Sequence, residues 1–384
     1  MKITYCHYLL DHVNRIMRGA ATRVVSRSQR LLTSRLLYSE AEKIGFAFDI
    51  DGVLTHGKYV LPEAVRTMEM LHKDSSPIVP VTFVTNSGGL TEQQKADQLS
   101  SMLNVRVHSH QVILSHTPFK DIVTKVKSEG PALVVGRGDT LQVAKSYGLN
   151  EVTSARELAT RDTSSVPFWK EIGSERMDQN HAYGTKEKPI KSVLIFTDPS
   201  DWYLELQVIL DVLQCGGVFG GSLETGSKRS IPSIYVSHQD TLWKNEFSNP
   251  RLGLGAFFAC LERLYTTATE RQLQYKAFGK PNIEPFKLAE NSLKQQALKV
   301  WQSEHLSKIF MIGDNPSVDI RGANNMGDPW VSVLVQTGVY KKEDQAEHGP
   351  GNECDIPDMV FDHVQDAVLS IIHQRRNHRW HSMR

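Results

Sequence analysis

The chain has 384 residues, of which 40% are hydrophobic and 23% are charged, a composition typical of a globular protein of two or three domains. Its net charge of +1 gives no basic field that would favour a nucleic-acid partner, and no apolar run approaches the roughly 18 residues that a membrane span needs. The four cysteines lack the spacing of a metal site and are typical of free thiols in a reducing compartment.

The N-terminal segment, residues 1–39, is strongly basic. It holds seven lysine and arginine residues and one acidic residue, Asp11, so its net charge is +6 and the rest of the chain carries −5. Serine, threonine and apolar residues are interleaved with the arginines. An arginine-rich, serine-rich and acid-poor amphipathic N-terminus is the composition of a mitochondrial transit peptide. We therefore predict a mitochondrial location; a basic disordered tail and a nucleic-acid-binding arm are the alternatives.

Short apolar runs separated by helical patterns follow this segment. The runs that predict β-strands are Ile44–Asp49, Val81–Asn86, Ala132–Gly136, Ser192–Thr197, Ile309–Asp314 and Val331–Val335. Between them, Pro62 suits the first turn of one helix, and Thr91 with Gln94 forms a capping box for another helix that runs to about Leu103. Apolar strands that alternate with helices predict an α/β fold, with a parallel sheet covered by helices on both faces. Residues 160–190 and 349–355 are predicted to be loops.

Four polar stretches are candidates for a site. They are Asp49-Ile50-Asp51-Gly52, Val84-Thr85-Asn86-Ser87, Gly279-Lys280-Pro281 and Ile312-Gly313-Asp314-Asn315, with Asp319 shortly after the last. Taken alone, each stretch has a structural explanation as a turn or a helix cap. Ligands of open α/β sheets bind at the carboxyl ends of strands, so the stretches that follow strands are expected to converge. Converging carboxylates need a cation, and hard oxygen donors suit Mg²⁺, which with Lys280 would hold a phosphate.

In this order, the four stretches resemble the motifs of the haloacid dehalogenase superfamily, specifically its aspartate-nucleophile phosphatases. The resemblance implies a Rossmann-like parallel-sheet core formed by residues 40–104 and 244–372. The long stretch between Thr85 and Lys280 matches the place where one branch of the superfamily inserts an α/β cap, here residues 105–243. Residues 373–384 remain as a basic tail. A homo-oligomer formed through the cap is left open.

The resemblance also implies roles for the acidic residues. Asp49 would be the nucleophile that forms an aspartyl-phosphate. Asp51 would protonate the leaving group and later activate water, while its backbone carbonyl binds Mg²⁺. Asp314 would ligate the metal together with Asp49, and Asp319 would order the metal's shell. The two acids that follow the first strand would thus divide nucleophilic work from acid–base work.

The remaining motif residues are implied to bind the phosphoryl group. Thr85, with the backbone of Asn86, would grip the phosphoryl oxygens, and Lys280 would neutralise charge between the phosphate and Asp49. The implied activity is a Mg²⁺-dependent phosphatase for a small phosphorylated metabolite. A binding or scaffold protein with little turnover, and phosphotransfer to an acceptor other than water, are the alternatives. Phosphorylated sugars, glycerol-type lipid headgroup precursors and nucleotides all remain open as substrates.

Three further stretches resemble one group within the superfamily, the haloacid dehalogenase-like hydrolase domain-containing protein five group. They are Asp198-Pro199-Ser200-Asp201-Trp202, Asp240-Thr241-Leu242-Trp243 and Arg251-Leu252-Gly253-Leu254-Gly255-Ala256-Phe257. Asp198 and Trp202 follow a predicted cap strand, so we expect them to reach toward the substrate. A capped turn and a packing role for Trp202 are the alternatives.

Overall fold

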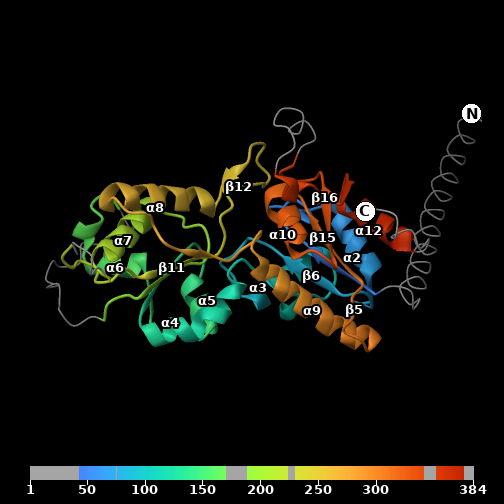
Figure 1. Cartoon of the computed structure of the whole chain (residues 1–384), viewed down its shortest axis with the longest axis horizontal. Coiled ribbons are helices and arrows are strands. Elements are labelled where there is room, and N and C mark those ends of the chain that lie inside the picture. Colours follow the sequence, from blue (N-terminus) through green and yellow to red (C-terminus); the bar gives the residue numbers. More distant parts are fainter. Residues whose placement is uncertain (1–42, 75, 170–187, 224–229, 341–351, 376–384) are drawn as a thin grey trace, which may run out of the picture.

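The structure, a computed structural model, describes residues 43–74, 76–169, 188–223, 230–340 and 352–375. Within these ranges the chain forms two lobes, each built on a parallel sheet (Figure 1). The predicted transit peptide, residues 170–187 of the first predicted loop, residues 349–351 of the second and most of the basic tail lie outside the described residues. None of the described helices has both the length and the apolar character to span a membrane.

The core lobe contains a six-stranded sheet in the order β17-β16-β15-β1-β6-β7, and all its strand pairs are parallel. The strands are β1 (Ile44–Phe48), β6 (Val81–Val84), β7 (Val112–Ile113), β15 (Lys308–Gly313), β16 (Trp330–Val335) and β17 (Met359–Phe361). Four of these, β1, β6, β15 and β16, confirm predicted strands, with ends that differ by one or two residues. Strand β1 lies in the middle of the sheet, so the acids that follow it are placed at the centre of one sheet edge.

Helices cover both faces of the core sheet. They are α2 (Pro62–Leu71), α3 (Glu92–Leu103), α9 (Ile283–Trp301), α10 (Arg321–Met326) and α12 (Val364–Arg375). Alternate residues of β1 point to opposite faces: Phe46 and Phe48 pack in a cluster with α2, α3 and α12, whereas Ala47 packs with α9 and α10. The capping box of Thr91 and Gln94 is present at the start of α3 and confirms that prediction.

The cap lobe contains a five-stranded parallel sheet in the order β14-β11-β10-β8-β9. Its strands are β8 (Ala132–Val135), β9 (Val152–Ser154), β10 (Ser192–Ile195), β11 (Ser233–Val236) and β14 (Lys276–Ala277). Its helices are α4 (Val123–Glu129), α5 (Thr140–Ser146), α6 (Ala155–Arg161), α7 (Trp202–Gln214) and α8 (Leu254–Thr269). Helices α6, α7 and α8 pack on one face of this sheet, and α4 and α5 pack on the other. The cap therefore repeats the layered plan of the core.

Short elements join these layers. Antiparallel pairs are formed by β2 (Thr55–His56) with β3 (Tyr59–Val60), β4 (His72–Lys73) with β5 (Ser76–Pro77), and β12 (Leu242–Trp243) with β13 (Arg251–Leu252). The short helices are η1 (Ser109–Gln111), η2 (Thr117–Ile122), η3 (Thr163–Ser165), η4 (Pro316–Ile320, a π-helix) and η5 (Glu353–Asp355). The hairpin of β12 and β13 lies between the two lobes (Figure 1).

The pairing of the strands divides core from cap at other residues than 105 and 243, the cap boundaries that the sequence predicts. Strand β7 pairs with β6 and so belongs to the core, whereas β14 pairs with β11 and so belongs to the cap. Helix α8 also belongs to the cap, since Phe257 and Leu261 lie in the cap's apolar cluster. Both strands have only two residues, too few to give an apolar run in the sequence. The chain thus leaves the core after β7 and returns to it after β14, directly before Lys280.

Candidate active site

The carboxyl ends of the central core strands bring the predicted residues together. Asp49 and Asp51 follow β1, Thr85 follows β6, and Asp314 follows β15. Lys280 arrives from the other direction, at the point where the chain returns from the cap. Its ammonium Nζ lies 2.6 Å from Asp49 Oδ1 and 2.8 Å from the carbonyl oxygen of Val84.

Lys280 also pairs with Asp319 of η4, whose Oδ1 lies 2.6 Å from Nζ. The Lys280 side chain is only 2% exposed. Burial acts to lower the pKa of Lys280, but the carboxylates of Asp319 and Asp49 outweigh it and raise this pKa above its ordinary value. Lys280 is therefore a permanent cation between two acids.

Three carboxylates form a group suited to a metal ion. Oxygen atoms of Asp49, Asp314 and Asp319 all lie within 4.8 Å of one another, and all three residues are buried. Asp314 Oδ2 accepts a hydrogen bond from the backbone N–H of Val339 at 2.6 Å, and Asp319 Oδ2 accepts one from that of Asn315 at 3.1 Å. Three acids facing one lysine leave uncompensated negative charge, and their side chains offer only oxygen atoms as ligands. The donor set therefore fits a hard divalent cation such as Mg²⁺.

The pKa values of Asp314 and Asp49 reflect the burial and the uncompensated negative charge of this cluster. Burial, together with the nearby charge of Asp319, raises the pKa of Asp314 to about 7. Burial also raises the pKa of Asp49, although Lys280 opposes this effect. Buried carboxylates hold a proton more tightly unless a cation compensates them. A bound cation would restore the ionised form that a nucleophilic carboxylate needs.

The backbone at Gly52 comes close to the acidic cluster, and glycine leaves room for it. Gly52 has a φ of +92°, and a Cβ atom on it would lie 2.5 Å from Asp314 Oδ2. Such a φ is costly for any residue with a side chain. Glycine at this position of the Asp49-Ile50-Asp51-Gly52 stretch is thus required both by the turn and by the neighbouring acid.

Asp51 is not among the three acids whose carboxylate oxygens lie within 4.8 Å of one another. Thr55 Oγ1 lies 3.4 Å from Asp51 Oδ1 and donates to it. Burial raises the pKa of Asp51, and the charge of Lys95 opposes this shift. A raised pKa favours the protonated form, which can donate a proton. The metal role predicted for Asp51 uses its backbone carbonyl and stays a prediction.

The residues after β6 are arranged unequally. Thr85 is 3% exposed, and its Oγ1 lies 3.1 Å from Ser87 Oγ, so a hydroxyl pair faces the pocket. The side chain of Asn86 is fully engaged: it bonds to the backbone of Lys280 and to the carboxylate of Asp240. This leaves the backbone of Asn86 for the role that the family resemblance implies, binding a phosphoryl group, which stays a prediction. Ser87 is an additional pocket residue that the sequence analysis did not single out.

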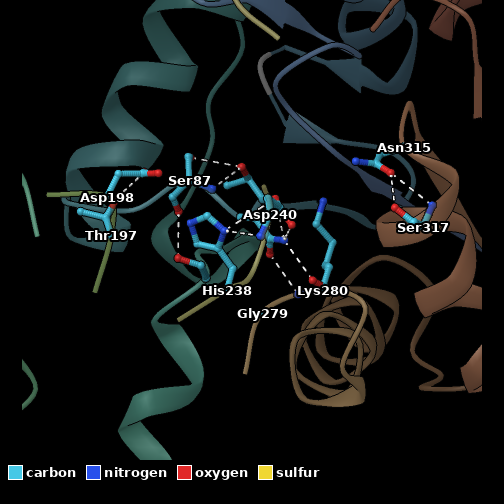
Figure 2. Close-up of polar contacts among 12 residues, drawn as sticks. Ser87, Thr197, Asp198, His238, Asp240, Gly279, Lys280, Asn315 and Ser317 are labelled. Carbon is cyan, nitrogen blue, oxygen red and sulfur yellow. Dashed lines mark hydrogen bonds and ion pairs between the residues drawn. The ribbon is translucent and has the colours of Figure 1, made fainter. Parts of the chain in front are cut away.

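One pocket joins the core acids to the cap. Figure 2 shows Lys280 of the core near His238 and Asp240 of the cap. Its cap wall is formed by residues after β8, β10 and β11 and by the start of the β12 hairpin. These residues are Arg137, Asp198, His238, Asp240, Leu242, Trp243 and Lys244. The carboxyl ends of both sheets thus face the same space. Arg137 is a pocket residue that the sequence alone did not single out; its place directly after a predicted strand is the signal that it lies at a ligand-binding edge.

Of the two cap residues expected to reach the substrate, Asp198 lines the pocket and Trp202 does not. Asp198 lines the pocket and lies 3.6 Å from the guanidinium of Arg137. Trp202 is not among the pocket residues: it begins α7 and packs against Phe257 with ring centroids 5.6 Å apart. Asp201 caps α7 by accepting a hydrogen bond from the N–H of Leu204 at 3.1 Å. The expectation that Trp202 reaches the substrate is therefore wrong, because the helix that Asp201 caps places the partly buried indole against the cap's apolar cluster.

Comparisons with known proteins agree with this geometry. Residues 46–150 match a family model described as haloacid dehalogenase-like hydrolase, and residues 277–367 match a second model of haloacid dehalogenase hydrolase-like proteins. A crystal structure of a glycerol phosphate phosphatase from Mycobacterium tuberculosis in complex with magnesium shares the fold, with a TM-score of 0.53 and 17% identity. That match covers 86% of this chain and 77% of the other.

Two sequence relatives match nearly the whole chain. A mitochondrial hydrolase of Saccharomyces cerevisiae is 33% identical over 89% of this chain and 99% of its own length. A Schizosaccharomyces pombe fusion protein of a CMP-forming cardiolipin synthase and a mitochondrial hydrolase is also 33% identical. That match covers 94% of this chain but 59% of the fusion protein, so the chain spans well under two thirds of it. On these matches, and on the site they contain, the chain belongs to the haloacid dehalogenase-like hydrolase family.

Proposed function

We propose that this protein is a Mg²⁺-dependent phosphatase that hydrolyses a small phosphorylated metabolite through an aspartyl-phosphate. One observation carries the proposal. The carboxylate of Asp49 lies 2.6 Å from a fully buried lysine, within a cluster of acids, at the floor of a pocket that the cap covers. A carboxylate held in this way can act as a nucleophile, while the lysine offsets the charge of an incoming phosphate.

The reaction has two chemical steps, and the site residues act in both. In the first, a carboxylate oxygen of Asp49 attacks phosphorus, the bond from phosphorus to the leaving oxygen breaks, and Asp51 gives that oxygen a proton. In the second, Asp51 takes a proton from water, the water oxygen attacks phosphorus, and the bond between phosphorus and Asp49 breaks. Throughout, Lys280 and the hydroxyl of Thr85 hold the phosphoryl oxygens, with the backbone N–H of Asn86 as a further donor. The raised pKa of Asp51 supports its part, because an acid catalyst must hold its proton near neutral pH.

Asp49, Asp314 and Asp319 would hold the metal ion, with the backbone carbonyl of Asp51 as a further ligand. When bound, Mg²⁺ would supply positive charge to the phosphoryl oxygens. The fit rests on the three buried carboxylates, which offer only oxygen atoms as ligands. The related fold of a phosphatase in complex with magnesium adds support.

A small substrate suits the covered site. The cap wall offers carboxylates, a guanidinium and an indole at close range, and a substrate must fit between the two sheet edges. Phosphorylated glycerol compounds lead the candidates, because one relative is fused to a cardiolipin synthase and one structural neighbour is a glycerol phosphate phosphatase. Phosphorylated sugars and nucleotides follow.

Location and subgroup belong to the same proposal. The +6 charge of residues 1–39 and the mitochondrial names of both yeast relatives support a mitochondrial enzyme. We assign it to the haloacid dehalogenase-like hydrolase domain-containing protein five group on the three stretches quoted above. A reporter fused to residues 1–39 should enter mitochondria, and replacing Arg23, Arg27 and Arg30 by glutamate should leave it in the cytosol. A wild-type fusion that stays in the cytosol would contradict the proposed location.

The function is tested by assaying the purified protein with 4-nitrophenyl phosphate and with a panel of phosphorylated glycerols, sugars and nucleotides. Release of phosphate should need Mg²⁺ and stop when EDTA is added. Turnover that persists with EDTA would contradict the metal assignment. If no phosphate ester is hydrolysed with Mg²⁺ present, a binding role on the same fold would be favoured instead.

A further inference from the structure

The side chain of Asn86 holds the backbone of Lys280 at two points. Its Oδ1 accepts a hydrogen bond from the backbone N–H of Lys280 at 2.9 Å, and its Nδ2 donates to the carbonyl oxygen of Lys280 at 3.0 Å. Asn86 belongs to the core and follows β6, while Lys280 is the first functional residue after the return from the cap. The amide thus fixes the backbone from which the lysine side chain reaches Asp49.

A cap residue determines which way this amide faces. Both carboxylate oxygens of Asp240 lie 2.9 Å from Asn86 Nδ2. A carboxylate only accepts hydrogen bonds, so exchanging the oxygen and nitrogen of the amide would place two acceptors against each other. Asp240 therefore reinforces, from the cap side, the orientation in which Asn86 Oδ1 meets the N–H of Lys280. Figure 2 shows Asp240, His238, Gly279 and Lys280 gathered in this region.

The backbone is built to permit this contact. A Cβ atom on Gly279 would lie 2.8 Å from Asn86 Oδ1 and 2.5 Å from the carbonyl oxygen of Ser237. Only glycine lets the returning chain come this close to β11 and to Asn86. Asp240 lies four residues after the end of β11, so the cap sheet itself sets its position.

We propose that Asp240 is a positioning residue that acts through Asn86 to place Lys280, and so ties the seating of the cap to the phosphate site of the core. The inference rests on the proposed function, in which Lys280 holds the phosphoryl group. Asp240 does not contact the reacting atoms in this account. When the cap shifts, Asp240 moves with it, Asn86 loses its fixed orientation, and the ammonium of Lys280 leaves its place between Asp49 and Asp319.

The test measures the affinity for inorganic phosphate in the presence of Mg²⁺, together with a crystal structure of the Asp240→Ala variant. Removing a negative charge beside an anion site would by itself strengthen phosphate binding. The proposal predicts the opposite, a loss of about tenfold or more, and a fall in kcat/KM for 4-nitrophenyl phosphate of about 10- to 100-fold, because small displacements of catalytic groups have effects of this size. In the crystal, Nζ of Lys280 should no longer contact both carboxylates.

Asp198→Ala is the matched control. It removes another cap carboxylate from the same pocket, but the described contacts of Asp198 are with Thr197 and Arg137, not with Asn86. This variant should not weaken phosphate binding. In an Asn86→Ala background, Asp240→Ala should cause little further loss, since the two residues act in series.

Asp240→Asn keeps one acceptor oxygen and should give an intermediate loss, which also decides the matter if the alanine variant does not fold. Phosphate affinity unchanged or increased in the Asp240 variants, or Lys280 retaining both ion pairs in the crystal, would overturn the proposal. The crystallographic result separates this failure from that of the proposed function: an inactive wild-type enzyme would strike the phosphatase assignment, while a displaced Lys280 would still support the positioning role.

Discussion

The two sheet edges that face the pocket have the same architecture but different electrostatics. At the core edge, Asp314 and Asp319 are 2% and 1% exposed, and each accepts a hydrogen bond from a fixed backbone N–H. At the cap edge, the side chains of Arg137 and Asp198 are 48% and 22% exposed and lie 3.6 Å apart, beyond hydrogen-bond distance. The core therefore presents a rigid charged group, and the cap presents an adaptable one.

This difference follows from what burial costs. A buried charge is tolerated only when partners compensate it, so every member of the core group depends on the others. A half-exposed charge is compensated by water and can be changed at little cost. Substitutions at the core edge should therefore remove the chemistry, whereas those at the more exposed Arg137 and Asp198 of the cap should change which substrate is preferred.

The largest effect is expected for Asp49→Asn. An amide has nearly the same shape but is a far poorer nucleophile, and it also weakens the metal site. We expect the rate of hydrolysis of 4-nitrophenyl phosphate to fall on the order of 10⁴-fold or more, as measured in a preparation free of other phosphatases. Near wild-type turnover by this variant would show that the core edge does not carry the nucleophile.

Asp51→Asn should have the next largest effect. Loss of a general acid–base catalyst typically costs about 10²- to 10⁴-fold in rate. The loss should be greatest for sugar or glycerol phosphates, whose alkoxide leaving groups need a proton, and milder for 4-nitrophenyl phosphate. Comparing kcat for the two substrate types provides the test. Equal losses would reduce Asp51 to a structural or metal-site residue.

Glu205, a buried acid of the cap, allows a stability test of the same contrast between buried and exposed charges. Burial, followed by the charge of Asp201, raises the pKa of Glu205 in α7 to about 8, and its Oε2 is buried without a hydrogen-bond partner. A raised carboxyl pKa means that the folded state holds the proton more tightly than the unfolded state. Stability is therefore lost as pH rises from the unfolded pKa of about 4.3 toward 8.

Replacing Glu205 by glutamine should thus stabilise the protein at pH 8, by about 1–2 kcal/mol, and have much less effect at pH 5. Denaturant unfolding at the two pH values measures this difference. The kinetics should stay unchanged, since Glu205 is not among the pocket residues. The same stability change at both pH values would contradict the assigned ionisation.

The smallest effect is expected for Arg137→Ala. Because the guanidinium is about half exposed, its loss should change KM by about 3- to 10-fold and reorder the preference among phosphorylated substrates. Affinity for Mg²⁺, measured by calorimetry, should not change. A loss of metal binding or of all turnover would show that the two edges are not separable in the way described.

The sequence predicts the core edge better than the cap edge for a physical reason. Asp49, Thr85 and Asp314 each follow a long apolar run, and the strand-end rule places them together without further information. Lys280 follows the two-residue strand β14, so only the resemblance to a family placed it in the site. Asp240 and Asn86 meet where the segment that follows β11 packs against the core. Neither periodicity nor turn chemistry can predict this contact. Trp202 looked like a substrate contact because it follows a strand, but helix capping by Asp201 turned it inward.

The central claim is that Asp49 carries the phosphoryl group between the two steps. In the Asp51→Asn variant the second step loses its base, while 4-nitrophenolate can still leave in the first. Mixing this variant with 4-nitrophenyl phosphate and Mg²⁺, quenching in acid and digesting for mass spectrometry should reveal a phosphorylated peptide with the modification on Asp49. A phosphoryl group on any other residue, or none on the enzyme while phosphate is released, would contradict the account.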